Sequence, residues 1–369
     1  MKIMTVFGTR PEAIKMAPLV CALQKEEGIE SVLCVTAQHR SMLDQVLELF
    51  DLMPKYDLDI MKERQTISMI TSRVLTGIER VLETEKPDRV LVHGDTSTTF
   101  ATALASFYQK IPVGHVEAGL RTYNRYSPFP EEMNRVLTGH IADLHFAPTP
   151  RNRDNLLREG IPADQIFITG NTVIDALLQV ADKPYRFEEA PLSDIDFSNK
   201  RVITVTCHRR ENQGEYMDNI FGAVADIALE FDDVEIVYPV HLNPVVRASA
   251  RRHLAGISNV HLIEPLMYLP FVHLMASSYF IITDSGGMQE EAPALSKPVL
   301  VVRKETERPE AVEAGTVKLA GVQRSTIYEL AQQLLTDSDL YESMAKAVNP
   351  YGDGKACSRI VEILKERKD

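Results

Sequence analysis

The 369-residue sequence has no tryptophan, few cysteines and no excess of basic residues. Its cysteines, Cys21, Cys34, Cys207 and Cys357, form no CxxC pair, so neither a disulfide framework nor a zinc site is indicated. Forty Lys and Arg against 52 Asp and Glu leave a net charge of −12. Because nucleic acids and anionic membranes attract basic surfaces, the charge argues against both as general partners.

Long apolar runs are also missing. No run approaches the roughly 20 residues that cross a bilayer, and a strand-like segment already begins at Lys2, so we expect neither a membrane span nor a signal peptide. The composition that remains, 44% hydrophobic and 25% charged, is that of an ordinary globular protein. These features predict a cytoplasmic protein.

The chain alternates short apolar runs with longer amphipathic ones, which favours parallel sheets covered by helices. Its length favours two or three domains. We therefore predict an α/β protein of two Rossmann-like, doubly wound domains facing a central cleft. The expected parts are an N-terminal domain over 1–170, a C-terminal domain over 171–353, and a final helix within 354–369 that packs back on the first domain.

Charged or small polar residues follow several predicted strands. In open parallel sheets, ligands bind beyond the carboxyl ends of the strands, so these residues are expected to share one crevice. The sequences after the strands are "GTRPE" at 8–12, "GDTS" at 94–97, "EAGLR" at 117–121, "CHRREN" at 207–212 and "DSGG" at 284–287.

Two of these junctions suit a phosphate group. The turn at 8–11 joins a strand to a helix, and Arg10 and Lys15 add positive charge near it. Gly286 and Gly287 permit close backbone approach to a diphosphate. Neither junction matches the dinucleotide or P-loop fingerprint. An ordinary strand–helix turn is an equally weighted interpretation of each.

Asp95, Glu117 and Glu131 are carboxylates that one crevice would bring within reach of each other. Clustered carboxylates raise one another's pKa and suit acid–base chemistry. The alternatives are a helix cap for Asp95 and a helix-start acid for Glu131. The spacing of the ligand-type residues fits no metal site, so no metal is expected. His208, beside Arg209 and Arg210, favours phosphate binding.

Taken together, the junctions resemble the non-hydrolysing UDP-N-acetylglucosamine 2-epimerases of bacteria. The matching stretches occur in the family's order through most of the chain. They are "FGTRPEAIKMAP" at 7–18, "VHGDTST" at 92–98, "HVEAGLRT" at 115–122, "PFPEEMNR" at 128–135, "ITGNTVID" at 168–175, "HRRENQG" at 208–214, "DSGGMQEEA" at 284–292 and "ERPE" at 307–310.

The resemblance implies a glycosyltransferase-B-like fold, often a homodimer, that interconverts UDP-N-acetylglucosamine (UDP-GlcNAc) and UDP-N-acetylmannosamine (UDP-ManNAc) without a cofactor. It implies that the catalytic residues are Asp95, Glu117, Glu131 and His208. The UDP-binding positions that it implies are Arg10, Lys15, His208, Phe271, Ser285, Gly286, Gly287, Glu291 and Arg308.

Some bacterial members of the family bind UDP-GlcNAc at a second, regulatory site. The matching positions here are Gln38, Arg64, Glu131, Arg209 and His241. The sequence departs from the pattern at Ser41, where such members often carry glutamine, which puts the strength of this regulation in doubt. It also departs at Leu266, where some members place a glutamine near the uracil.

The chemistry of the resemblance fits an elimination. The proton at the second sugar carbon is not next to a carbonyl, and the sequence has no nicotinamide fingerprint for oxidising a neighbouring carbon. UDP would leave while a base takes that proton, giving 2-acetamidoglucal. The alternatives are a hydrolysing epimerase, a glycosyltransferase and a non-catalytic UDP-sugar sensor. The product would supply a cell-envelope polysaccharide, and the residues do not indicate which polysaccharide.

Overall fold

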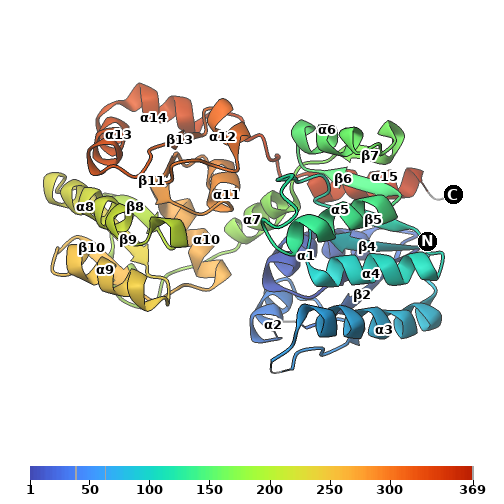
Figure 1. Ribbon diagram of the computed structural model, residues 1–369. Helices are drawn as coiled ribbons and strands as arrows, with labels where there is room; N and C mark the ends of the chain where they lie inside the picture. The colour runs from blue at the N-terminus through green and yellow to red at the C-terminus, as the bar shows by residue number, and fades with distance from the viewer. Residues whose placement is uncertain (38–39, 63, 368–369) are drawn as a thin grey trace. The chain divides into compact units, whose positions relative to one another are not determined.

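The computed structural model describes residues 1–37, 40–62 and 64–367 (Figure 1). The chain divides into two compact units. Unit 1 comprises Met1–Ala176 and Tyr351–Asp369, and unit 2 comprises Leu177–Pro350. No helix within the described ranges is both long and apolar enough to span a membrane.

Unit 1 is built on a parallel sheet that has seven strands within the described residues, in the order β3-β2-β1-β4-β5-β6-β7. Its sheet order reverses between β1 and β4, which is the topological switch point of a doubly wound sheet. The strands are β1 (Lys2–Phe7), β2 (Glu30–Val35), β3 (Tyr56–Asp57), β4 (Arg89–His93), β5 (Val113–Val116), β6 (Leu144–Ala147) and β7 (Ile166–Ile168).

The helices of unit 1 form neighbouring sets along the sheet (Figure 1). Helix α3 packs on α4 and α4 on α5, while α1 packs on both α2 and α15. Val74, Ile78 and Ala101 bury the apolar side of α3 and α4 against β1 and β4. The helices are α1 (Arg10–Lys25), α2 (Arg40–Leu49), α3 (Ile67–Glu85), α4 (Ser97–Tyr108), α5 (Glu131–Ile141), α6 (Pro150–Arg158), η1 (Ala163–Gln165) and α15 (Ala356–Glu366). Helix α7 (Thr172–Ala181) begins in unit 1 and continues into unit 2 from Leu177.

Unit 2 repeats the plan with a parallel sheet, six-stranded over the part of the chain that is described, in the order β10-β9-β8-β11-β12-β13. The switch point lies between β8 and β11. The strands are β8 (Arg201–Thr206), β9 (Val234–Pro239), β10 (Val260–Ile263), β11 (Phe280–Thr283), β12 (Val299–Val301) and β13 (Val317–Leu319).

The core of unit 2 is rich in large side chains, with Phe221, Tyr238 and Phe280 all fully buried. Its helical segments are η2 (Leu192–Asp194), η3 (Arg210–Asn212), α8 (Glu215–Glu230), α9 (Pro244–Leu254), α10 (Tyr268–Ser277), α11 (Met288–Ala294), α12 (Pro309–Glu313), α13 (Arg324–Thr336) and α14 (Ser338–Ala345). The predicted α/β class with two doubly wound parallel sheets is confirmed.

Candidate functional site

The switch points place most of the predicted loops together within each unit. In unit 1, the residues after β1, β4 and β5 lie at the carboxyl ends of adjacent strands. In unit 2, the residues after β8 and β11 do the same. Because ligands of doubly wound sheets bind at this position, each group of loops is a candidate half-site.

Glu117, directly after β5, is the centre of the half-site in unit 1. Its backbone has a φ of 61°, a strained conformation for a residue with a side chain. Lys15 of α1 donates a hydrogen bond to its Oε1 atom and forms an ion pair with it. Asn171, just before α7, donates from Nδ2 to the same oxygen at 3.1 Å. Two separate elements therefore hold the carboxylate in place.

Asp95 lies beside this cluster and pairs with a different cation. Its carboxylate accepts from Arg135 of α5, and its backbone oxygen accepts from Asn134 Nδ2 at 2.9 Å. Burial raises the pKa of Asp95, and Arg135 opposes that rise. Glu131, the first residue of α5, is half-buried one turn before Asn134 and Arg135. The third predicted carboxylate is thus carried by the same helix as the two residues that contact Asp95.

The turn after β1 differs from the phosphate loop that the sequence suggested. The backbone N–H groups of Gly8 and Thr9 donate to Glu12 Oε2 at 3.0 and 2.8 Å. The other oxygen of Glu12 accepts from the hydroxyls of Thr96 and Thr99 at 2.6 and 3.2 Å. These two N–H groups are therefore occupied by the capping box of α1. A phosphate at this turn would depend on the half-buried side chain of Arg10.

Asp284, the first residue after β11, organises the half-site in unit 2. The fully buried carboxylate accepts from the backbone N–H of His208 at 2.9 Å and of Arg209 at 2.8 Å. It also accepts from Asn212 Nδ2 at 3.1 Å. The loop after β8 is thereby fixed to the end of β11, and this fixes the backbone from which the side chains of His208 and Arg209 project.

His208 stacks on a second histidine. Its ring lies 5.2 Å from that of His241, with 17° between the planes. Its Nδ1 atom is 3.7 Å from Asp284 Oδ1. Burial lowers the pKa of His208, and the nearby Asp284 opposes the shift. A neutral imidazole can donate one hydrogen bond to a ligand and accept another.

The glycine turn after β11 is bordered by the predicted binding groups. A Cβ atom built on Gly286 would lie 3.7 Å from Arg209 Nη2 and 3.9 Å from Arg308 Nη2. One on Gly287 would lie 3.8 Å from Glu291 Oε2 and 4.0 Å from the Ser285 hydroxyl. Glycine therefore leaves open a space between two guanidinium groups, a hydroxyl and a carboxylate, which matches the polarity of a sugar diphosphate.

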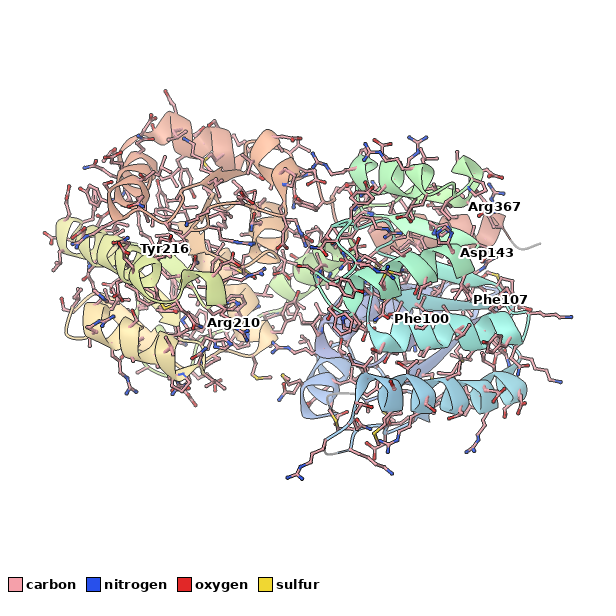
Figure 2. All side chains as sticks on the ribbon, viewed as in Figure 1. Phe100, Phe107, Asp143, Arg210, Tyr216 and Arg367 are labelled. Carbon is pink, nitrogen blue, oxygen red and sulfur yellow. The ribbon has the colours of Figure 1, made fainter. Side chains whose placement is uncertain are left out.

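The loop just after β12 contacts the loop that carries His208 and Arg209 and the start of α8. Buried Arg303, just after β12, donates from Nε to Glu211 Oε1 at 2.8 Å. Lys304 donates to the hydroxyl of Tyr216 at 2.6 Å and lies 4.2 Å from the centre of its ring. Figure 2 labels Tyr216 at the start of α8 and Arg210 at the start of η3. The loop that carries His208 and Arg209 is thus tied to the segment that leads to Arg308.

The remaining predicted residues are placed as follows. Phe271 is half-buried in α10 of unit 2. Arg64 is exposed in unit 1 with a φ of 55°. Gln38 and the side chain of Ser41 lie outside the described residues. Leu266 borders an open cavity of about 850 Å³ in unit 2 that is lined mainly by residues 184–192 and 262–267.

Several side chains that organise the half-sites were missed from the sequence. Glu12 had a readable signal, because a threonine three residues before a glutamate at a helix start is a capping box. Asn171 and Arg135 carry no such local signal, since their partners lie 54 and 40 residues away. In residues 1–37, 40–62 and 64–367, no group of three or more His, Cys, Asp or Glu side chains could hold a metal ion.

Comparison with known proteins identifies the relatives of this architecture. The model of the family described as UDP-N-acetylglucosamine 2-epimerase matches residues 21–365. The chain belongs to the UDP-N-acetylglucosamine 2-epimerase family. It is 60% identical over 364 residues to the UDP-N-acetylglucosamine 2-epimerase of Bacillus subtilis, covering 99% of this chain and 95% of the relative. It is 58% identical over 373 residues to that of Escherichia coli K12, covering 100% and 99%.

A solved structure of the family superposes on the whole chain. The crystal structure of UDP-GlcNAc 2-epimerase from Neisseria meningitidis bound to UDP-GlcNAc is 54% identical, covers 100% of both chains and gives a TM-score of 0.88. This likeness confirms the glycosyltransferase-B-like fold expected from the resemblance. It also makes the two switch points of this family member the natural place to look for its chemistry.

Proposed function

We propose that the chain catalyses the reversible epimerisation of UDP-GlcNAc to UDP-ManNAc at the second sugar carbon, without hydrolysing the nucleotide sugar. Family membership supports the epimerase activity. The observation that carries the chemical proposal is the cluster of Lys15, Glu117 and Asn171 beside Asp95. It offers a held carboxylate and a second carboxyl group with a raised pKa, which are the parts of an acid–base pair.

The proposed reaction is an elimination followed by a re-addition. A base removes the proton from the second sugar carbon, the electrons of that bond form a double bond to the anomeric carbon, and UDP leaves with the electrons of the anomeric C–O bond. The products of this step are 2-acetamidoglucal and UDP. A proton then adds to the opposite face of the second carbon, UDP adds back to the anomeric carbon, and UDP-ManNAc results.

The two proton transfers are assigned from the surroundings of the carboxylates. Lys15 and Asn171 donate to Glu117, and donors to the charged form favour an ionised carboxylate, as a base requires. Burial raises the pKa of Asp95 and favours its protonated form, as an acid requires. Glu131 is the third carboxylate of the sugar site. In the reverse reaction, from UDP-ManNAc to UDP-GlcNAc, Asp95 is the base and Glu117 is the acid.

The diphosphate is assigned mainly to unit 2. Arg308 and Ser285 border the open space at Gly286 and Gly287, and His208 lies in the loop after β8 that Asp284 holds. The resemblance also assigns Arg10 to the diphosphate. Positive charge and N–H donors that face the leaving diphosphate stabilise the charge that develops as UDP departs. Phe271 and Glu291 complete the proposed UDP contacts, the first as an apolar surface and the second as an acceptor for hydroxyl groups.

Regulation and assembly are proposed from the resemblance. UDP-GlcNAc is proposed to bind also beside the active site, through Arg64, Glu131, Arg209 and His241, with Gln38 added. A sigmoidal dependence of rate on UDP-GlcNAc would support this, and a hyperbolic dependence would reject it. We further propose a cytoplasmic homodimer that supplies a cell-envelope polysaccharide. Analytical ultracentrifugation tests the dimer, since a single species near 41.4 kDa would exclude it.

Identification of the products tests the proposed function. The purified protein is incubated with UDP-GlcNAc and EDTA, with no nicotinamide cofactor added, and the mixture is separated by anion-exchange chromatography. The proposal predicts UDP-ManNAc that approaches a constant ratio to UDP-GlcNAc from either starting sugar. Free N-acetylmannosamine and UDP as the main products would select the hydrolysing reaction instead. Binding of UDP with no conversion would indicate a sensor.

A further inference from the structure

His93 is a buried histidine at the end of β4 to which the reaction above gives no role. It is 3% exposed and stands two residues before Asp95. Neither ring nitrogen has a hydrogen-bond partner among the described residues. Its Nε2 atom lies 3.6 Å from Glu117 Oε2. An imidazole without partners is costly to bury, by about 1–3 kcal/mol for each unsatisfied polar group, so its nitrogens call for an explanation.

The backbone after His93 is shaped around the same oxygen. Gly94 has a φ of 64°, and a Cβ atom built on it would lie 3.3 Å from Glu117 Oε2. The carbonyl oxygen of Gly94 is 2.7 Å from His115 Nε2, so a second buried histidine holds this turn. The end of β4 therefore encloses Oε2 between the imidazole of His93 and the backbone of Gly94.

Burial keeps the ring of His93 neutral. Burial lowers the pKa of His93 to about 4; Glu117 acts against this shift and Lys15 adds to it. At neutral pH the ring has one N–H and one bare nitrogen. Lys15 and Asn171 donate to Oε1 of Glu117, whereas the Nε2 atom of His93 lies 3.6 Å from the other oxygen, Oε2.

We propose that His93 is a positioning residue for Glu117, with its Nε2–H group donating to Oε2 when the nucleotide sugar is bound. The present distance of 3.6 Å exceeds a hydrogen bond. Catalytic hydrogen bonds of free enzymes are commonly long and shorten in the substrate complex. The inference rests on the proposed function, since it assumes that Glu117 is the base.

The proposed bond has two effects. It fixes the rotation of the carboxylate between donors on each oxygen, which orients the base toward the sugar carbon. It also stabilises the ionised form and so lowers the pKa of the base. Besides His93, the groups that act on Glu117 include Lys15 from α1, Asn171 before α7 and Asp95 after β4, whose pKa Glu117 in turn helps to raise. None of these three is altered in the test.

The test compares H93L with H93Q. Leucine removes the donor, whereas the amide nitrogen of glutamine reaches about as far as Nε2. We expect H93L to lower kcat about 10- to 100-fold, within the range that positioned proton-transfer groups contribute. We expect KM to change less than about threefold, and the acidic limb of the kcat–pH profile to move to higher pH, because loss of a donor raises the pKa of the base. We expect H93Q to restore most of kcat and to return the acidic limb to its wild-type position.

Two results would overturn the proposal. The first is an H93L protein whose acidic limb of the kcat–pH profile does not move. The second is an H93Q protein with the same low kcat and the same loss of thermal stability as H93L, which would show that His93 contributes packing alone. If H93L does not fold, 15N NMR of histidine-labelled wild-type protein decides, since the proposal requires a neutral ring protonated at Nε2 when UDP-GlcNAc is bound. A ring protonated at Nδ1 rejects it. Absence of UDP-ManNAc with wild-type protein rejects the proposed function itself.

Discussion

At the scale of single residues, the proposed chemistry depends on the contrast between Glu117 and Asp95. Both carboxylates pair with a cation, Glu117 with Lys15 and Asp95 with Arg135. They differ in their surroundings, because Asn171 adds a further donor to Glu117, while burial raises the pKa of Asp95. Environments that separate the proton affinities of two carboxylates are how one site provides both a base and an acid at neutral pH.

Glu117→Gln tests this contrast. The variant keeps the shape of the side chain but cannot accept a proton, so we expect kcat to fall by about 10²- to 10⁴-fold. Binding of UDP, measured by isothermal titration calorimetry, should stay within about threefold because the diphosphate is assigned mainly to unit 2. Glu27→Gln, an exposed change in the same unit, serves as the control. Turnover of Glu117→Gln equal to that of the control would remove Glu117 from the chemistry.

At the scale of elements, Arg303 joins the loop after β8 to the segment that leads to Arg308. Its side chain is 7% exposed, and its guanidinium group lies between Glu211 and Glu307, at 2.8 and 3.5 Å. Asn212 adds a bond from the same loop to the carbonyl oxygen of Val302 at 3.0 Å. The buried cation is thus a clamp that holds two binding loops in register.

Arg303→Met should loosen both loops and leave Glu211 without its buried partner. Both carboxylates that pair with Arg303 are more than half exposed, so loss of each pair costs only about 0.2–1 kcal/mol. We therefore expect UDP binding to weaken by about threefold or more, because the loops lose their connection, together with a small fall in melting temperature. Arg324→Met removes an exposed pair with Asp226 in the same unit and should leave UDP affinity unchanged. Equal UDP affinities for the two variants would count against the clamp.

The strands β4, β5 and β6 carry a group of buried histidines that gives unit 1 an acid sensitivity. Burial lowers the pKa of His93 to about 4, of His115 to about 3 and of His145 to about 4. His115 and His145 are paired across β5 and β6. Between these values and about 6.5 the unfolded chain binds more protons than the folded one, so stability rises with pH in this window and is lost as the pH falls.

Urea unfolding followed by circular dichroism should show this loss. From pH 7 to pH 5 we expect the midpoint to fall, with each histidine contributing about 1 kcal/mol per pH unit once the pH is well below 6.5. His145→Asn should flatten the dependence, whereas His140→Asn, at an exposed position on α5, should not. A wild-type midpoint that is the same at both pH values contradicts the assignment of neutral buried rings.

At the scale of the whole molecule, the end of the chain returns to unit 1. Helix α15 packs on α1, but its own N-cap residue, Lys355, makes no side-chain capping bond. Asp175 of α7 supplies the cap, accepting from the backbone N–H groups of Ala356 and Cys357 at 3.1 and 2.9 Å. A carboxylate about 180 residues earlier in the sequence therefore begins the last helix.

Asp175→Ala should undo this cap. Two buried N–H groups would lose their acceptor, at a cost of about 1–3 kcal/mol. Relative to wild type, we expect hydrogen exchange to become faster in peptides from α15 and to stay unchanged in peptides from α13, which lies in unit 2. Asp337→Ala removes the N-cap of α14 and is the matched control, because it should affect unit 2 alone. Unchanged exchange in α15 would show that the packing on α1 is sufficient.

The sequence predicted the α/β class because buried parallel strands and amphipathic helices each have a recognisable local spacing of apolar residues. It also indicated which residues follow the strands. It did not indicate their partners: Lys15 meets Glu117 across 102 residues and His208 meets Asp284 across 76, and no local pattern encodes such contacts. Short elements were missed for a related reason, since β3 (Tyr56–Asp57) and β13 (Val317–Leu319) are too brief to show a period.

The proposed removal of a proton from the second sugar carbon is tested most directly by proton NMR in deuterated water. Wild-type protein is given UDP-GlcNAc and EDTA, and the signal of the second sugar proton is followed with time. The account predicts UDP-ManNAc that carries deuterium at this carbon from its first appearance, and gradual entry of deuterium into the remaining UDP-GlcNAc. Formation of UDP-ManNAc that retains the original proton would contradict it.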